Sequence, residues 1–359
     1  MDFDLDETHR DLRDLAADVL AREAATDRLD AHERTGDAYD AATWRALARA
    51  GLLGALVPEE HGGAGLGAIA LTVVLREAGV RTAPVPAYAT LALAALPLAL
   101  HGTGAQKALL AGVASGETIL TGAYREAGPA GEVRATARRE GDRHLVTGVK
   151  TFVPFAAQAA RILVPARTED GEIAVFLVEP DAATLTDHPS ATTDPLYRVE
   201  LDGAPGDPLG PGAWTTLRRT AVLGAVALAS GVIDGALTLT ADYVKTREQF
   251  GRPLAQFQAV TMNVGDVYIA KRALDVAVWS AAWRTEHGDP DADLAVAAYN
   301  AAGPVVQALY TCQHLHGGIG LDVTYPLHRS FAWGKHAGHL LGGADDQLDT
   351  LGALVAQEV

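Results

Sequence analysis

Cysteine is almost absent from this sequence. Cys312 is the single cysteine among 359 residues. An intrachain disulfide needs two cysteines, and zinc or iron–sulfur sites built from cysteine need several, so both kinds of site are excluded. A chain without disulfides is typical of a reducing compartment, and we therefore expect a cytoplasmic protein.

Positive charge is also scarce. The chain has 29 lysines and arginines against 45 aspartates and glutamates, which gives a formal net charge of −16. Such a chain repels the phosphates of nucleic acids and of anionic membrane surfaces. We therefore expect neither a nucleic acid nor a membrane as a partner.

Long hydrophobic runs are lacking as well. The two most apolar stretches are residues 89–100, which Pro97 interrupts, and residues 221–236, which contain Ser230 and Asp234. Neither reaches the roughly 20 apolar residues of a membrane-spanning helix. The N-terminal residues 1–7 are acidic and no apolar segment of a secretion signal follows them, so we expect no such signal.

The apolar residues that are present, 48% of the chain, can bury a large core in more than one subdomain. We predict an α+β fold, mostly α, with an N-terminal helical domain (1–116), a middle β-barrel-like domain (117–207) and a C-terminal four-helix bundle (208–359). The expected helices are at 40–50, 67–79, 87–100, 104–114, 213–243 and 254–287, with one from 289 to 316 and a last one from 345. The expected strands are at 119–124, 144–152, 161–166 and 173–178.

One segment in the C-terminal region combines residues suited to a nucleotide cofactor. It reads Tyr243-Val-Lys-Thr-Arg-Glu-Gln-Phe-Gly-Arg-Pro-Leu-Ala-Gln-Phe-Gln258. Arg247 would hold a diphosphate, Phe250 would pack on a flat ring, and Gln258 would hydrogen-bond a ribose or phosphate oxygen. The same residues also suit an ordinary helix-to-helix turn in which the arginine caps a helix, so residue types alone leave both interpretations open.

This segment resembles the Arg-x-x-Phe-Gly…Phe-Gln signature of the acyl-CoA dehydrogenase family. Gln313-His-Leu-His-Gly-Gly-Ile-Gly320, followed by Tyr325-Pro-Leu-His-Arg329, is similar to the family's Gln-x-x-Gly-Gly-x-Gly segment. A third similar segment is Gly51-Leu-Leu-Gly-Ala-Leu-Val-Pro-Glu-Glu-His-Gly-Gly-Ala-Gly-Leu-Gly67. The three segments keep the family's order over nearly the whole chain.

The resemblance implies FAD as the cofactor, bound between two subunits. In this family one subunit surrounds the isoalloxazine ring and supplies the catalytic base, while its neighbour reaches across to the ADP half. The second role is implied here for Arg247, Phe250, Gln258, Gln313, Gly317 and Gly318. The two glycines would let backbone N–H groups approach the cofactor closely, although a Gly-Gly pair is also a plain helix C-cap.

The resemblance also implies dehydrogenation of an acyl-CoA substrate, which needs a carboxylate base. The family keeps this glutamate either just before the last helix or near the start of the long C-terminal helix. Here the first place reads Leu341-Gly-Gly-Ala344 and the second Leu217-Arg-Arg-Thr-Ala-Val-Leu223, with no acid at either. Gly342 cannot take a proton, and Asp345, with Asp346 beside it, is only a weak candidate because such aspartates are usually N-caps.

Two segments that touch the flavin ring in the family are altered too. The usual Thr-Glu-Pro-x-x-Gly-Ser reads Tyr124-Arg-Glu-Ala-Gly-Pro-Ala-Gly131, and the usual Trp-Ile-Thr reads Phe152-Val-Pro154. Proline in place of the threonine removes both the hydroxyl and the backbone N–H. We therefore predict one half of an α2β2 enzyme whose second subunit bears the base, similar to the smaller, degenerate subunits of steroid side-chain acyl-CoA dehydrogenases. An electron-transfer flavoprotein or a similar acceptor would reoxidise it.

Two other interpretations stay open. One is a self-sufficient homotetramer that takes its base from Asp345 or Asp346, and the other is a flavin-free scaffold, against which the retained Arg247 and Gln258 argue. Gly63-Ala-Gly-Leu-Gly67 lacks the spacing and the strand context of a dinucleotide loop. No metal is expected, because no metal-ligand spacing accompanies the histidines of the last third, His314, His316, His328, His336 and His339.

Overall fold

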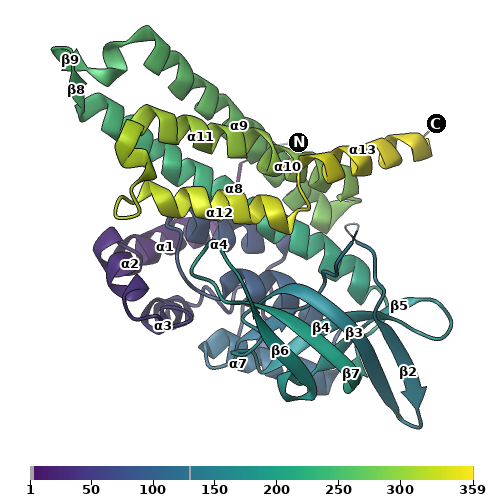
Figure 1. Ribbon diagram of the computed structural model, residues 1–359. Helices are drawn as coiled ribbons and strands as arrows, with labels where there is room; N and C mark the ends of the chain where they lie inside the picture. The colour runs from purple at the N-terminus through teal and green to yellow at the C-terminus, as the bar shows by residue number, and fades with distance from the viewer. Residues whose placement is uncertain (1–3, 129–130, 359) are drawn as a thin grey trace.

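The computed structural model describes residues 4–128 and 131–358. Residues 1–3 of the acidic N-terminus, and Pro129 and Ala130 of the altered 124–131 segment, lie outside this description. A bundle of long helices stands over a curved sheet, and the N-terminal helices pack beside and behind both (Figure 1). This arrangement confirms the predicted α+β, mostly α, fold class.

The N-terminal region is helical throughout. Its elements are α1 (Glu7–Glu23), α2 (Thr26–Glu33), α3 (Ala41–Arg49), η1 (Glu59–His61), α4 (Ala68–Val80), the π-helical η2 (Tyr88–Ala95), α5 (Leu96–His101), α6 (Gly104–Lys107) and α7 (Leu109–Ser115). The carboxylates of Asp6 and Asp40 cap α1 and α3 by accepting backbone N–H groups. All residues of η2 are buried, as a helix that is apolar on every side must be.

The middle region is a nearly closed sheet. Its elements are β1 (Leu120–Gly122), β2 (Thr136–Glu140), β3 (Arg143–Pro154), β4 (Arg161–Arg167), β5 (Ile173–Val178), η3 (Pro180–Ala182), β6 (Ala183–His188) and β7 (Leu196–Pro208). The strand order is β1-β4-β2-β3-β7-β5, and the additional β4–β5 pairing closes the sheet into the expected barrel-like shape. The sequence did not predict β2, β6 or β7. β2 buries one residue, Ala137, so it shows no clear alternation.

The C-terminal region contains the longest helices. Its elements are α8 (Ala213–Thr246), β8 (Glu248–Gln249), β9 (Arg252–Pro253), η4 (Leu254–Gln256), α9 (Gln258–His287), α10 (Asp291–Ala302), α11 (Pro304–His316), η5 (Gly317–Leu321), α12 (Leu327–Leu340) and α13 (Ala344–Glu358). The single helix predicted over 289–316 is wrong: Gly303 and Pro304 divide it, because proline has no N–H for the helical ladder. The sequence also missed α12. The predicted limits of the three domains stay a prediction.

Glycines join α8 directly to α4. A Cβ on Gly231 would lie 1.9 Å from the backbone oxygen of Arg76, and a Cβ on Gly79 would lie 2.3 Å from that of Leu228. The two helices therefore touch backbone to backbone, which no larger residue would permit. This contact ties the bundle rigidly to the N-terminal helices.

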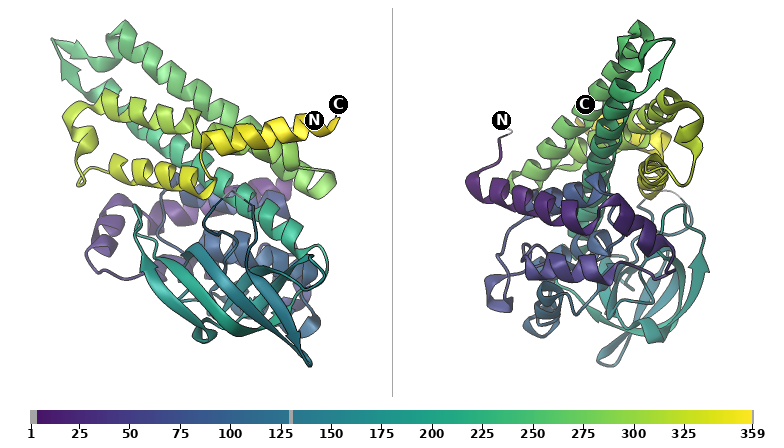
Figure 2. Two further views of the ribbon diagram at one scale, coloured as in Figure 1. Left: turned by 45° about the vertical axis from the view of Figure 1, so that its right-hand side comes forward. Right: turned by 90° about the vertical axis from the view of Figure 1, so that its left-hand side faces the viewer.

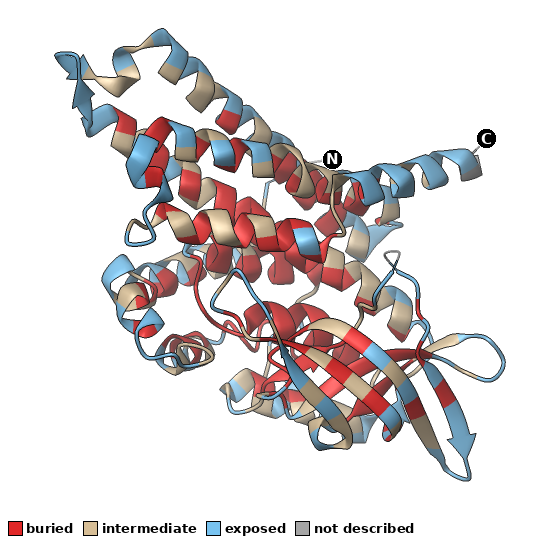
Figure 3. Ribbon diagram, viewed as in Figure 1, coloured by how far each residue is buried: buried red, intermediate tan, exposed pale blue. Residues whose placement is uncertain are grey.

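The longest helix, α8, is apolar for reasons of packing. Among the described helices it alone is long and apolar enough to cross a membrane, yet 67% of its most apolar stretch is buried inside the protein. Figure 3 shows it as a mostly buried element in the middle of the bundle. By contrast, α13 extends away from the body in Figure 1 and in the left view of Figure 2, and most of its surface is exposed.

Candidate functional site

A small hairpin at the far end of the bundle carries the first predicted site residues. It joins α8 to α9 through β8 and β9 and projects from the molecule (Figure 1). Phe250 at its tip is 91% exposed and has a left-handed φ of 52°, an uncommon conformation for a bulky residue. Its ring meets that of Phe257 edge to face at 6.2 Å. The hairpin thus presents an aromatic ring to the outside of the chain.

Arg247 lies at the C-terminus of α8 with its guanidinium uncommitted. Its backbone N–H donates to the oxygen of Tyr243 at 2.8 Å, which closes the last helical turn. The side chain is exposed and makes no ion pair or hydrogen bond among the described residues. Gln258, the first residue of α9, is exposed as well. Both can therefore receive a ligand without breaking an internal contact.

Gln313, Gly317 and Gly318 meet at the end of α11. Gly317 has φ 64°, which favours glycine, whereas a Cβ on Gly318 would find open space. Gln313 is turned inward and its amide donates to the oxygen of Gly320 at 3.3 Å. In this arrangement Gln313 shapes the turn, and the backbone at Gly317 and Gly318 faces solvent.

An aromatic cluster joins the two sets of residues. His316 stacks on Tyr243 of α8 with ring centroids 4.4 Å apart, and the Tyr243 hydroxyl donates to the His316 oxygen at 3.3 Å. Tyr325 packs against both rings. The ends of α8 and α11 are therefore side by side. Together we call Arg247, Phe250, Gln258, Gln313, Gly317 and Gly318 the nucleotide half-site.

His314 is a residue of this corner that the sequence reasoning missed. In the family pattern glutamine stands three residues before the first glycine, and here the residue three before Gly317 is His314 rather than Gln313. The structure places His314 on the exposed side of the last turn of α11. Counting that interval would have identified it from the sequence.

A second set of residues lies where the sheet meets the end of α12. The guanidinium of Arg125 donates to the backbone oxygens of His339 at 2.5 Å and Leu340 at 2.6 Å. The hydroxyl of Tyr124 also donates to the Leu340 oxygen, at 3.2 Å. These three bonds join the segment after β1 to the end of α12, and we call this contact the Arg125 bridge.

The altered Phe152-Val-Pro segment borders the Arg125 bridge. The register of β3 against β7 shifts between Lys150 and Val153, and Phe152 within this bulge has φ 55°. Its ring lies 5.7 Å from the guanidinium carbon of Arg125. Pro154 has no N–H to offer, and its oxygen accepts the hydroxyl of Thr121 at 2.7 Å. Pro154 therefore presents no donor toward a ligand.

Hydroxyl contacts connect the two places where the family keeps its base. The Tyr88 hydroxyl lies 3.5 Å from that of Tyr124 and 3.2 Å from the oxygen of Ala221 on α8. Burial, together with the neighbouring Tyr124, raises the pKa of Tyr88 well above its usual value, so it stays a neutral donor. The path from residues 217–223 to Leu340 is thus occupied by two tyrosines.

Neither place supplies a carboxylate directed inward. Gly342 has φ 86°, and a Cβ on it would lie 2.5 Å from Oδ2 of Asp346. Asp345 and Asp346 are both exposed in the first turn of α13. Asp346, rather than Asp345, is therefore the acid beside the altered position.

The acids nearest the start of α8 are committed to arginines. Arg218 and Arg219 bind Asp291 at 2.8 and 2.9 Å. Burial tends to raise the pKa of Asp291, but these two arginines outweigh it and hold the pKa below its usual value. A carboxylate with a depressed pKa is a poor general base.

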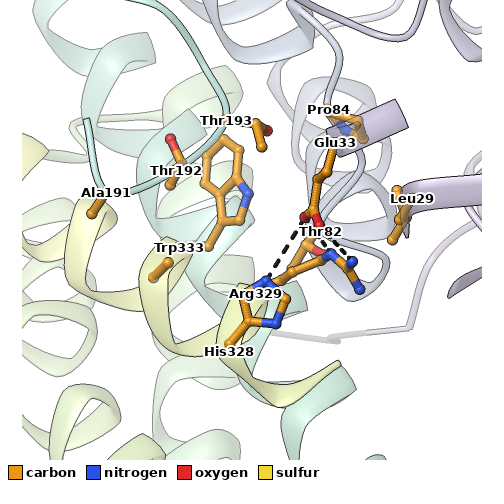
Figure 4. A pocket seen from close by; sticks show the side chains of 11 residues that line it. Leu29, Glu33, Thr82, Pro84, Ala191, Thr192, Thr193, His328, Arg329 and Trp333 are labelled. Carbon is orange, nitrogen blue, oxygen red and sulfur yellow. Dashed lines mark hydrogen bonds and ion pairs between the residues drawn. The ribbon is translucent and has the colours of Figure 1, made fainter. Parts of the chain in front are cut away.

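Figure 4 shows a cavity of about 230 Å³ elsewhere, between α2, the β6–β7 loop and α12. Trp333 and Thr192 line one side of this cavity, and Arg329 and Glu33 line the other. Arg329 is already bound to Glu33 at 2.6 Å and to Asp30 at 2.5 Å. The cavity contains none of the predicted site residues, and no group of metal-binding side chains occurs among the residues described.

Comparison with known proteins identifies the family of this chain. The sequence matches the acyl-CoA dehydrogenase N-terminal domain over residues 6–117 and the acyl-CoA dehydrogenase C-terminal domain over residues 216–353. With helices on either side of a barrel-like sheet, these matches define an oxidoreductase of the acyl-thioester dehydrogenase class. The chain belongs to the acyl-CoA dehydrogenase family.

Relatives align over nearly their whole length. Acyl-CoA dehydrogenase FadE28 of Mycobacterium tuberculosis is 36% identical over 98% of both chains, and FadE27 of the same organism is 33% identical over 99% of both. Among solved structures, a variant of the Tcur3481–Tcur3483 steroid ACAD superposes with a TM-score of 0.93 at 41% identity over 98% of both chains. The ChsE4–ChsE5 complex of M. tuberculosis also gives 0.93, at 33% identity over 99% of both. Fold neighbours were solved with FADH2 or FAD, which confirms the cofactor at the level of the family.

Proposed function

We propose that this chain is one subunit of a heteromeric acyl-CoA dehydrogenase in which it supplies the ADP half of the FAD site. A partner subunit supplies the contacts to the flavin ring and the catalytic base. The observation that supports this proposal is the Arg125 bridge: Tyr124 and Arg125 come from the segment that touches the flavin ring in the family, and here they donate to the end of α12.

The ring side of the chain does not fit a flavin. A planar ring held there needs open space and hydrogen-bond donors directed at its edge. Nη1 of Arg125 and the hydroxyl of Tyr124 donate to the end of α12, and Pro154 has no N–H to donate. An inward carboxylate is missing as well, since Gly342 stands at the usual place. These four features agree with the loss of one complete half-site.

The nucleotide half-site fits the ADP portion. Arg247 offers five N–H donors with no partner among the described residues, which suits a diphosphate. The turn at Gly317 and Gly318 exposes backbone, and Phe250 offers an aromatic face outside the chain. FAD, when bound, accepts the hydride from the substrate. This chain's own contribution is to hold and orient the far end of that cofactor.

The surface of α9 supports an assembly with other chains. Met262, Ile269, Val276 and Trp283 follow at intervals of seven residues and are 61, 66, 45 and 39% exposed. This apolar stripe runs about 30 Å along the helix. Such a stripe is costly in a monomer and typical of an interface. We call these four residues the α9 stripe.

The comparisons suggest the assembly and the substrate class of the proposed enzyme. Two of the similar structures are a steroid ACAD and the ChsE4–ChsE5 complex. We infer by analogy an α2β2 assembly in the cytoplasm that acts on a steroid side-chain CoA ester. An electron-transfer flavoprotein or a similar acceptor would take the electrons.

The test is to purify the chain alone and together with a base-bearing acyl-CoA dehydrogenase chain of the same organism. Flavin absorbance per chain and the mass of each assembly are then measured. We expect little flavin in the lone chain and one FAD per pair in a heterotetramer. One FAD per lone chain together with acyl-CoA oxidation would overturn the proposal.

A matched pair of variants examines the half-site in the complex. Arg247→Ala should weaken FAD binding by about 10- to 100-fold, since charge-assisted bonds contribute roughly 1.5–3 kcal/mol. Lys245→Ala removes the same charge two residues away, where lysine lies near Asp242, and should leave FAD affinity unchanged. Equal affinities of the two variants would remove Arg247 from the site.

A further inference from the structure

His316 is buried between the two parts of the nucleotide half-site. His316 is only 3% exposed. It is the last residue of α11, directly before the turn at Gly317. The ring stacks on Tyr243 at 4.4 Å and packs against Tyr325 at 5.3 Å. Three segments, the ends of α8 and α11 and the chain before α12, therefore meet on one imidazole.

The hydrogen bonds fix the tautomer of this ring. Nδ1 lies 2.8 Å from the backbone oxygen of Cys312, and because a carbonyl only accepts, Nδ1 must carry the proton. Nε2 is buried and has no hydrogen-bond partner among the residues described. A neutral imidazole tolerates this environment, whereas an imidazolium would bury an unpaired charge and an unused donor.

We propose that His316 is the positioning residue of the nucleotide half-site: its neutral ring holds the Gly317–Gly318 turn beside the end of α8 that carries Arg247. This inference rests on the proposed function. His316 is not assigned to the cofactor's contacts. It acts by keeping two separate pieces of chain at a fixed spacing, which a diphosphate held from both sides requires.

The arrangement makes nucleotide binding sensitive to acid. The titratable side chains packed against the ring are Tyr243 from α8 and Tyr325 from the segment before α12, and α11 contributes the backbone oxygen of Cys312. None of them can neutralise an imidazolium. Burial lowers the pKa of His316 below the usual 6.5, although the bond to Cys312 opposes this. The half-site is therefore intact above pH 6.5 and is lost as pH falls through the lowered pKa.

The experiment measures FAD affinity of the heteromeric complex from pH 5.5 to 8 for three forms. His316→Phe keeps a stacking ring but can neither titrate nor donate to Cys312. We expect about tenfold weaker FAD binding at pH 8, roughly 1.4 kcal/mol, and no further loss toward pH 5.5. The wild-type complex should lose affinity toward acid. His336→Phe, in another buried histidine of α12, should keep the wild-type acid slope.

Outcomes separate this inference from the function on which it rests. If the wild-type complex binds no FAD at any pH, the proposed function fails and this inference fails with it. If the complex binds FAD but His316→Phe shows the wild-type affinity and acid slope, only the positioning role is overturned. Should His316→Phe not assemble, imidazole nitrogen NMR of the wild-type chain decides: an Nε2–H tautomer would refute the fixed geometry.

Discussion

The guanidinium of Arg125 lies 2.6 Å from the backbone oxygen of Leu340, although 215 residues separate them in the chain. This bond, with its companion to His339, anchors the sheet to the last turn of α12. Arg125→Ala should destabilise the chain by about 2 kcal/mol, because the backbone oxygens of His339 and Leu340 lose a charged donor. Urea unfolding measures this.

The control for that variant is Arg138→Ala, on exposed strand β2, which should change the unfolding free energy by less than about 0.5 kcal/mol. We also expect Arg125→Ala to gain no dehydrogenase activity, since the substitution adds no carboxylate beside Gly342. Unchanged stability of Arg125→Ala would mean that the Arg125 bridge is incidental and does not close the ring side.

Asp194, in the loop between β6 and β7, is a buried carboxyl without a hydrogen-bond partner among the described residues. Burial raises its pKa well above the usual 3.8. Asp194 therefore ionises at a lower pH in the unfolded chain than in the folded chain. Its contribution to the free energy of unfolding is lost as pH rises through the folded-state pKa. Asp194→Asn should therefore stabilise the protein at pH 8 by about 1–3 kcal/mol.

Thermal unfolding at pH 5 and pH 8 tests this, and the gain should be larger at pH 8. Asp187→Asn, an exposed position on β6, is the matched control and should have little effect. A lower melting temperature for Asp194→Asn at both pH values would show that the carboxylate is paired in solution.

The α9 stripe should control assembly. Ile269→Lys places a charge at its centre and should convert the heterotetramer to smaller species, as measured by mass photometry or light scattering. Asp18→Lys adds a lysine at an exposed position of another helix, α1. It should leave the mass unchanged. A heterotetramer that survives Ile269→Lys would exclude this surface as an interface.

Asp346 provides the sharpest test of a self-sufficient enzyme. Its carboxylate is the acid beside Gly342. We expect Asp346→Asn to leave turnover of the reconstituted complex unchanged, with Asp345→Asn as the neighbouring control. A drop of 100-fold or more in Asp346→Asn alone would identify a relocated base, because removing a general base costs about that much.

The helices at the core and the family were predictable from the sequence because their signals are local. Apolar periodicity marked α1, a long stretch almost without turn signals marked α8, and the segment around Arg247 survives as a short motif. The Arg125 bridge was not predictable. The sequence around Arg125 and Glu126 is typical of a loop. The carbonyls that Arg125 binds lie on α12, a helix that the sequence did not predict. That helix buries Arg329 and His336, so its inward face does not look apolar.

Backbone conformation explains other omissions. The left-handed φ of Phe152 follows from a bulge against β7, a strand that was itself missed. The burial of Asp194 depends on how the β6–β7 loop folds, and no sequence pattern marks that. The position of His314 was within reach, since only the interval to Gly317 had to be counted.

Phe250, at the tip of the hairpin, has consequences for how a cell must make this protein. Its ring is 91% exposed to water and its backbone has an unfavourable positive φ. Both features cost free energy in the isolated chain. Without a neighbouring chain to cover it, that tip is a ready point for aggregation and for proteases. We therefore expect the two subunits to be produced in matched amounts, and any surplus of this one to be degraded.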